Sequence, residues 1–187
     1  MKILVLVLVI ILAACSSTSN KSEFKAENLI QKFPLPEGDW DVHQREPEGT
    51  NMLETRWVSK TSDDLAQTFV MYNTPNGDPQ RTMDSDHKVG KKNCDILFQS
   101  DLVSNEVQNG YPQLTWQSEC KSSNGYYSKT IHKTISGNDS QYAFKRIFKS
   151  KPSDESWQLW LSYASSIEVC DSRSNQHPCP EGYKKVE

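Results

Sequence analysis

Side chains that could bind a metal ion lie close together near the C-terminus of this 187-residue sequence. Cys170, His177 and Cys179 carry the thiol and imidazole groups that zinc prefers as ligands. Their spacing matches no closed zinc finger, no fourth ligand is evident, and oxidation would consume both thiols. We therefore expect no metal site, and nothing else in the sequence indicates a bound cofactor.

Motifs that would assemble a catalytic centre are missing from the sequence. There is no G-x-S-x-G elbow, H-E-x-x-H pair, C-x-x-C pair, Walker loop or G-x-G-x-x-G turn. Residues 22–25 fit S-x-x-K, but they belong to an expected tether in which no pocket could organise them. We therefore expect a protein that is not an enzyme. A deep polar pocket that converges on His43, His87 or His132 would favour an enzyme instead.

The other polar residues of interest have simpler structural interpretations. His132 lies in a candidate strand, and we interpret it as an outward-facing polar position. The paired carboxylates Asp63-Asp64 and Asp84 with Asp86 are typical of helix starts and solvated helix faces.

The N-terminus has the pattern of an export signal. Lys2 precedes an uninterrupted apolar run over residues 3–14, which is too short to span a bilayer but has the length of a signal-peptide core. The run ends in LAAC at residues 12–15, which resembles the lipobox of bacterial lipoproteins. This resemblance implies cleavage after residue 14 and attachment of a diacylglycerol group to the Cys15 thiol. The alternatives are a secretory signal with a chance cysteine, or a buried apolar strand.

Lipidation would determine where the rest of the chain is located. Two or more acyl chains would make membrane attachment effectively permanent. Ser16 and Ser17 follow the cysteine, with no aspartate at the second position, and the same resemblance then favours the outer membrane. We expect a signal peptide over residues 1–14, a lipidated tether with a short helix over 15–33, and one periplasm-facing domain over 34–187.

Export would place the remaining four cysteines in an oxidising compartment, where an even number indicates disulfide bonds. Three pairings are possible. We expect the pairs that are closest in sequence, Cys94 with Cys120 and Cys170 with Cys179. A loop the length of the first would contribute about 3 to 3.5 kcal/mol in the chain-entropy model.

The charge of the chain argues against nucleic acid as a partner. Removal of residues 1–14 would take away Lys2 and leave 20 basic and 24 acidic side chains, a net charge near −4. Binding to DNA or RNA needs clustered Lys and Arg, which this balance does not provide. The expected partners are the membrane, through the lipid, and a protein of the cell envelope.

Strand and helix patterns alternate in the first half of the domain. Apolar side chains at i, i+3, i+4 and i+7 over residues 26–33 predict a short helix that Pro34 ends, and we expect this helix to dock on the domain rather than remain part of the tether. A second helix is predicted from Asp78-Pro79 toward Asn93. The candidate strands are residues 40–43 and 52–59, and residues 62–72 fit either a helix or a strand.

The second half predicts two hairpins and a final helix. Asn109-Gly110 and residues 136–139 are turn sequences between apolar strand patterns. After Ser153, side chains at 157, 160 and 161 recur at helical spacing. The strands of the two hairpins are residues 96–107, 113–120, 126–135 and 142–148. This order predicts an α+β fold, in which helices pack on a single twisted antiparallel sheet stabilised by disulfides.

Three classes of function remain open. The pattern over residues 135–142, with Trp157 and residues 169–171, is similar to the C-terminal part of small proteobacterial envelope lipoproteins, a resemblance that implies no activity. We expect a non-enzymatic binding or assembly module, in which the aromatic side chains either build the core or form a contact patch. The alternative is an immunity or inhibitor lipoprotein whose acidic surface suits a basic target. A hydrolase assembled from distant segments is the third class.

Overall fold

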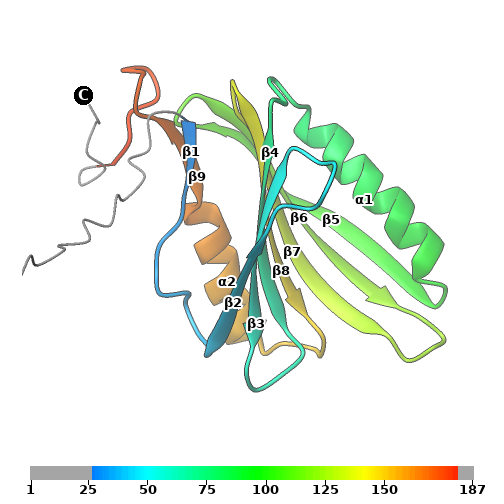
Figure 1. Ribbon diagram of the computed structural model, residues 1–187. Coiled ribbons are helices and arrows are strands. Elements are labelled where there is room, and N and C mark those ends of the chain that lie inside the picture. Colours follow the sequence, from blue (N-terminus) through cyan, green and yellow to red (C-terminus); the bar gives the residue numbers. More distant parts are fainter. Residues whose placement is uncertain (1–26, 181–187) are drawn as a thin grey trace, which may run out of the picture.

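A seven-stranded antiparallel sheet forms the body of the protein in the computed structural model, which describes residues 27–180. Two helices, α1 (Pro79–Asn93) and α2 (Asp154–Ser166), lie on opposite faces of this sheet (Figure 1). The strands, in spatial order, are β2 (Trp40–Arg45), β3 (Met52–Ser59), β4 (Leu65–Tyr72), β8 (Ser140–Phe148), β7 (Tyr127–Ser136), β6 (Tyr111–Lys121) and β5 (Leu97–Gln108). The predicted α+β class is therefore confirmed.

The hairpins form where the turn residues predicted them. Asn109 and Gly110 join β5 to β6 with φ values of 49° and 81°, and positive φ at both turn positions matches the right-handed twist of the flanking strands. The β7–β8 hairpin also forms. Within the ambiguous residues 62–72, Leu65–Tyr72 form β4, because residues 65–71 pair with β3 and the whole strand pairs with β8.

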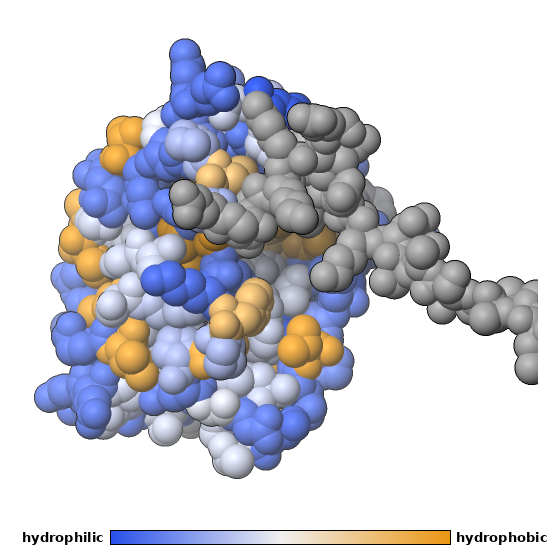
Figure 2. Space-filling model, turned by 90° about the vertical axis from the view of Figure 1, so that its left-hand side faces the viewer, coloured by the Kyte–Doolittle hydropathy of each residue, from blue (hydrophilic) through white to orange (hydrophobic). Residues whose placement is uncertain are grey.

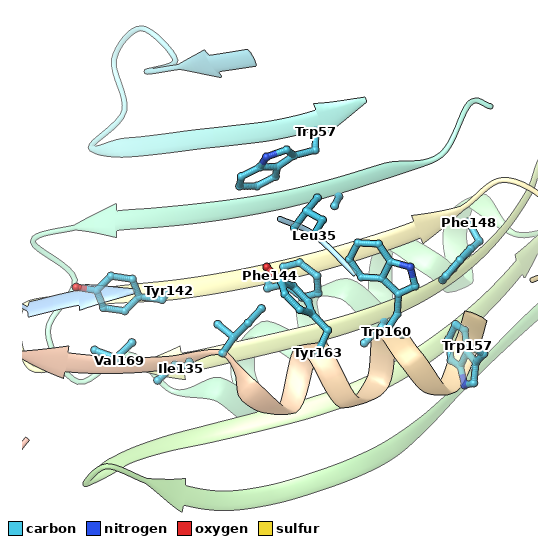
Figure 3. Packing of buried hydrophobic residues seen from close by; sticks show 14 of the residues in the cluster. Leu35, Trp57, Ile135, Tyr142, Phe144, Phe148, Trp157, Trp160, Tyr163 and Val169 are labelled. Atoms are coloured by element: carbon cyan, nitrogen blue, oxygen red, sulfur yellow. The ribbon is translucent and has the colours of Figure 1, made fainter. Parts of the chain in front are cut away.

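The hydrophobic core lies between α2 and one face of the sheet. Ser153 caps α2, and the helix buries Trp157, Trp160, Tyr163 and Ala164. Figure 3 shows the rings of α2 pointing toward Phe144 and Phe148 of β8. The helical spacing over residues 157–164 therefore marks the side chains that face the core. Burial of these large rings removes much apolar surface from water.

Helix α1 differs from α2 because it covers the opposite face without burying any of its own residues. Its N-terminus forms as the sequence predicted, with Asp78 accepting a hydrogen bond from the Gln80 N–H at 2.9 Å and Pro79 in the first turn. Polar contacts and a disulfide at its last turn hold it to the sheet.

The predicted helix over residues 26–33 is wrong. Within the described residues, Glu27–Ile30 form strand β1, which pairs antiparallel with β9 (Glu168–Asp171), a strand that the sequence analysis did not predict. The Glu27 carboxylate also accepts hydrogen bonds from the backbone N–H groups of residues 138–140, the nearest at 2.6 Å. An apolar spacing that spans only two turns fits either element, and these long-range partners favour the strand. Residues 27–33, assigned to the tether, therefore pack on the domain.

Both disulfides join the cysteine pairs expected from the sequence. Cys94 at the end of α1 is bonded to Cys120 of β6, and Cys170 of β9 is bonded to Cys179. Cys15 and the expected signal peptide lie outside the described residues.

Among residues 27–180, no helix has both the length and the apolar character needed to cross a membrane. Figure 2 shows the side of the molecule where β1 and α2 lie in Figure 1. On this side hydrophobic side chains occur as separate spots on a mostly hydrophilic surface.

Candidate functional site

A cavity of about 370 Å³ lies between α1 and the sheet face that it covers. Side chains of α1, β5, β6, β7 and β8 line it together with the β6–β7 turn. The lining combines aromatic rings with many hydroxyl, amide and charged groups: Asp86, His87, Phe98, Trp116, Ser118, Ser122, Asn124, Tyr126, Ser128, Thr130, His132 and Lys145.

Strand alternation explains why this face is polar while the opposite face is apolar. On β7, Ile131 and Ile135 belong to the hydrophobic cluster under α2, whereas Thr130 and His132 line the cavity. Successive side chains of a strand point to opposite faces, so one run of sequence supplies both surfaces. The sheet therefore has one face for stability and one face with the chemistry of a binding site.

Three side chains from separate elements form a connected polar chain in the cavity. Ser118 Oγ of β6 lies 2.8 Å from His132 Nε2 of β7. On the other side of the ring, His132 Nδ1 lies 3.2 Å from Asp86 Oδ2 of α1, although the ring N–H does not point squarely at that oxygen. This is the order of groups in a nucleophile, base and orienting carboxylate.

The electrostatics of this chain favour an ionised Asp86 and a neutral His132. Burial raises the pKa of Asp86, but its contact with His132 and the Lys145 ammonium, 2.8 Å away, outweigh burial and lower that pKa to about 2. Burial lowers the pKa of His132 to about 4, against the opposing effect of Asp86. At neutral pH the imidazole is therefore uncharged.

Trp116 forms the floor beneath His132. The two rings stack at a centroid distance of 4.8 Å and an interplanar angle of 7°. The indole is 1 % exposed, and its Nε1–H has no hydrogen-bond partner among residues 27–180. An unpaired buried donor costs about 1 to 3 kcal/mol, a cost that the packing of the indole between the sheet and the imidazole must offset.

A second histidine–serine pair lies beside the cavity, which His87 lines and Ser100 does not. His87 Nε2 of α1 lies 2.7 Å from Ser100 Oγ of β5, and the Ser100 hydroxyl donates to the Gln117 carbonyl at 3.0 Å. This pair fastens α1 to the sheet.

Two interpretations of polar residues from the sequence are wrong. His132 is 7 % exposed and faces the cavity rather than solvent, because α1 covers that face of the sheet. Asp86 is part of the same site rather than of a solvated helix face. Asp64 starts no helix; it forms an ion pair with the buried Arg146 at 2.9 Å.

The remaining histidines lie elsewhere. His43 is exposed on β2. The His177 ring packs against Tyr111 at a centroid distance of 4.4 Å and a tilt of 32°, while Cys170 and Cys179 are joined to each other. No cluster of three metal-binding side chains occurs in the described part of the chain.

The missed site had a weak signal in the sequence. Trp116 and Ser118 are two residues apart on one predicted strand, and His132 is on the next, so their shared face could have been inferred from the alternation. The contribution of Asp86 depends on how α1 crosses the sheet, which the alternation does not specify.

Comparison with known proteins identifies the fold alone. The sequence matches no protein-family model and no curated protein. The structure is similar to the solution structure of cyanobacterial PsbP from Synechocystis, with a TM-score of 0.54 and 10% identity, over 84% of this chain and 98% of that chain. A Pseudomonas aeruginosa protein of unknown function is less similar, with a TM-score of 0.36 and 10% identity, over 66% of this chain and 94% of that chain.

Proposed function

We propose that this chain is a lipoprotein anchored in the outer membrane through Cys15, and that its periplasm-facing domain binds a small ligand in the cavity under α1. The apolar run and the LAAC sequence at residues 12–15 support the anchor. Binding of a ligand in the cavity is the function that the lining of the cavity supports.

The observation that carries the binding proposal is the cavity itself, in which aromatic rings and hydroxyl, amide and charged groups from five elements converge. The Asp86 carboxylate is already paired with Lys145, so the cavity offers little net charge to the ligand. The expected ligand is therefore a small polar molecule with hydrogen-bonding groups and an apolar part that fits against Phe98 and Tyr126.

The Trp116 indole N–H can serve as the reporter of binding in an NMR experiment. We expect a fraction of the low-molecular-weight periplasmic extract to shift the Trp116 indole resonance of the full-length ¹⁵N-labelled protein in detergent micelles. The Trp57 resonance, from the α2 side of the sheet, should stay in place. Substitution of Trp116 by Phe assigns the peak.

A matched pair of variants tests whether the cavity is the site. Ser128→Leu places a larger apolar side chain in the cavity lining, whereas Ser85→Leu makes the same change on the exposed surface of α1. The first variant should abolish the shift and the second should retain it. If no fraction shifts Trp116, or if both variants respond like the natural protein, the cavity is not a ligand site.

The anchor is tested separately in cells. Wild-type protein should incorporate labelled palmitate and sediment with outer membranes, and Cys15→Ser should lose the label and either leave the membrane or stay unprocessed. Soluble, unlabelled wild-type protein in the periplasm would contradict the anchor.

The edge of the sheet favours the second candidate, an immunity or inhibitor lipoprotein. On the edge strand β5, Leu102, Val103 and Val107 are exposed, and the charged side chains are Asp101 and Glu106. An exposed strand edge of this composition suits an extended segment of a basic protein. Crosslinking from β5 positions in intact cells should recover a basic toxin or hydrolase if this candidate is right.

A further inference from the structure

The two serine–histidine pairs under α1 differ in the direction of their hydrogen bonds. At the first pair, the Ser100 hydroxyl donates its proton to the Gln117 carbonyl. Ser100 Oγ can therefore only accept from His87, whose Nε2 must carry the proton in that contact. A serine in this arrangement is not activated, because its neighbour is a donor rather than a base.

At the second pair the direction is reversed. The ionised Asp86 carboxylate faces His132 Nδ1 at 3.2 Å and favours the proton on that nitrogen. His132 Nε2 then carries a lone pair, and the Ser118 hydroxyl, whose Oγ lies 2.8 Å away, donates to it. Ser118 Oγ has no other hydrogen-bond partner among the described residues, so its proton is directed at a base.

The surroundings hold this arrangement and leave the serine accessible. Trp116 stacks on the imidazole and fixes the plane of its ring. Ser118 lines the cavity and is partly exposed, while His132 is buried. Trp116 Nε1–H, on the same face of β6 two residues before Ser118, is a donor without a partner within residues 27–180.

We propose that Ser118 is a nucleophile that accepts an acyl group from an ester bound in the cavity, with His132 as its general base and Asp86 as a positioning residue. This activity goes beyond ligand binding and rests on the same cavity. Ser118 Oγ lies within hydrogen-bond reach of the base, and the Asp86 carboxylate lies 3.2 Å from the other ring nitrogen, which is the order of groups around an activated nucleophile.

The reaction balances with water as the only co-reactant. Ser118 Oγ attacks the ester carbonyl carbon, a C–O bond forms, and the Oγ proton moves to His132 Nε2. The bond to the alkoxy group breaks, and the alcohol leaves with the proton from His132. A water molecule then attacks the acyl-serine, and the carboxylic acid and free Ser118 are restored.

The experiment uses the full-length protein in detergent and two probes, a serine-directed fluorophosphonate and p-nitrophenyl butyrate. We expect the fluorophosphonate to modify Ser118, as located by peptide mapping, and the butyrate ester to be hydrolysed. Ser118→Ala should lose both reactions. His132→Gln should slow both by about 100-fold or more, the usual size of a general-base contribution.

Ser85→Ala is the matched control, because it removes a serine hydroxyl from the exposed surface of α1, outside the cavity lining. It should change the labelling and hydrolysis rates by less than about twofold. Asp86→Asn should shift the acidic limb of the pH–rate profile rather than only lower the rate, since its role is to orient His132. Circular dichroism spectra of all four variants must match the natural protein.

Failure of this inference can be told apart from failure of the binding proposal. Absence of label at Ser118 in folded protein, or labelling that His132→Gln leaves unchanged, overturns the nucleophile. A Trp116 indole shift in the same preparation would leave ligand binding in place. Loss of labelling in Ser85→Ala to the same extent as in Ser118→Ala would show that the label does not depend on the Ser118 hydroxyl, and would also overturn the nucleophile.

Discussion

At the scale of single residues, the buried imidazole of His132 makes the protein sensitive to acid. Burial lowers the pKa of this side chain from its ordinary value of 6.5 to about 4. Between these two pH values the unfolded chain binds a proton that the folded protein excludes. Stability is therefore fully present above about pH 6.5 and is lost as the pH falls through about 4.

We predict that the free energy of unfolding falls by on the order of 2 to 3 kcal/mol between pH 7.5 and pH 4 because of His132. Asp86 contributes little in this range, since its folded pKa of about 2 lies below its ordinary value of 3.8 and most of its stabilisation is lost below about pH 4. Urea titrations at four pH values would measure the slope.

His132→Gln should flatten this slope, whereas His43→Gln, at an exposed position, should keep it. Equal slopes in all three proteins would show that His132 titrates normally in the folded state.

Predictions for single residues were right where neighbouring residues determine the structure, and wrong where an element far away in sequence determines it. The cysteine pairs and the caps at Asp78 and Ser153 follow from neighbouring residues. His132 is buried because α1 crosses the sheet above it. No residue close to His132 in the sequence indicates where α1 lies.

At the scale of elements, the contact between α1 and β5 depends on Gly90. A Cβ atom at this position would lie 2.0 Å from Cε2 of Phe98, so the helix and the ring approach each other closely only because the side chain is absent. Glycine inside a helix costs about 1 kcal/mol relative to alanine, and here that cost is offset by packing.

Gly90→Ala should therefore destabilise the protein by about 1 kcal/mol, because displacement of Phe98 outweighs the gain in helix propensity. In a Phe98→Ala background the same substitution should stabilise it by up to about 1 kcal/mol. Chemical denaturation of the four proteins in the double-mutant cycle measures this reversal. A stabilising effect in both backgrounds would mean that α1 does not rest on Phe98.

Elements with strong local signals formed as the sequence predicts, including β3 at residues 52–59 and α1 after Asp78. The exceptions are short and depend on partners far away in sequence. β1 and β9 have four residues each, and the pairing of Glu27 with Asp171 joins the two ends of the described chain. Pairing between segments so far apart in sequence leaves no periodic pattern in either segment.

At the scale of the whole molecule, the two disulfides stabilise different parts of the fold. The Cys94–Cys120 bond closes a separation of 26 residues and the Cys170–Cys179 bond one of 9. In the chain-entropy model these loops contribute about 3.5 and about 2.5 kcal/mol.

Replacing Cys94 and Cys120 by serine should therefore lower the free energy of unfolding more than replacing Cys170 and Cys179. The first pair of substitutions should also expose the end of α1 to limited proteolysis, because α1 has no buried side chains of its own. Mass spectrometry of the cleavage products would locate the exposed site. Equal losses of stability and identical cleavage patterns would contradict this division.

The predicted architecture and the polar cavity come from the same alternation of side chains, but only the architecture could be predicted. Buried rings such as Trp160 and Phe144 form a periodic apolar pattern that indicates a core. The cavity face carries serine, threonine and histidine, residues that are equally typical of a strand facing water. Whether such a face is solvated depends on the helix above it.

The pairing of β1 with β9 also has a mechanical consequence. Its hydrogen bonds lie roughly perpendicular to the strands, so tension that reaches Glu27 from the preceding chain and runs along β1 loads them in shear. All four residue pairs then resist together, with the bonds from residues 138–140 to the Glu27 carboxylate in parallel. A strand pulled from its end in this geometry slides as a unit instead of peeling one bond at a time. The point where the chain enters the domain is thus suited to carry load.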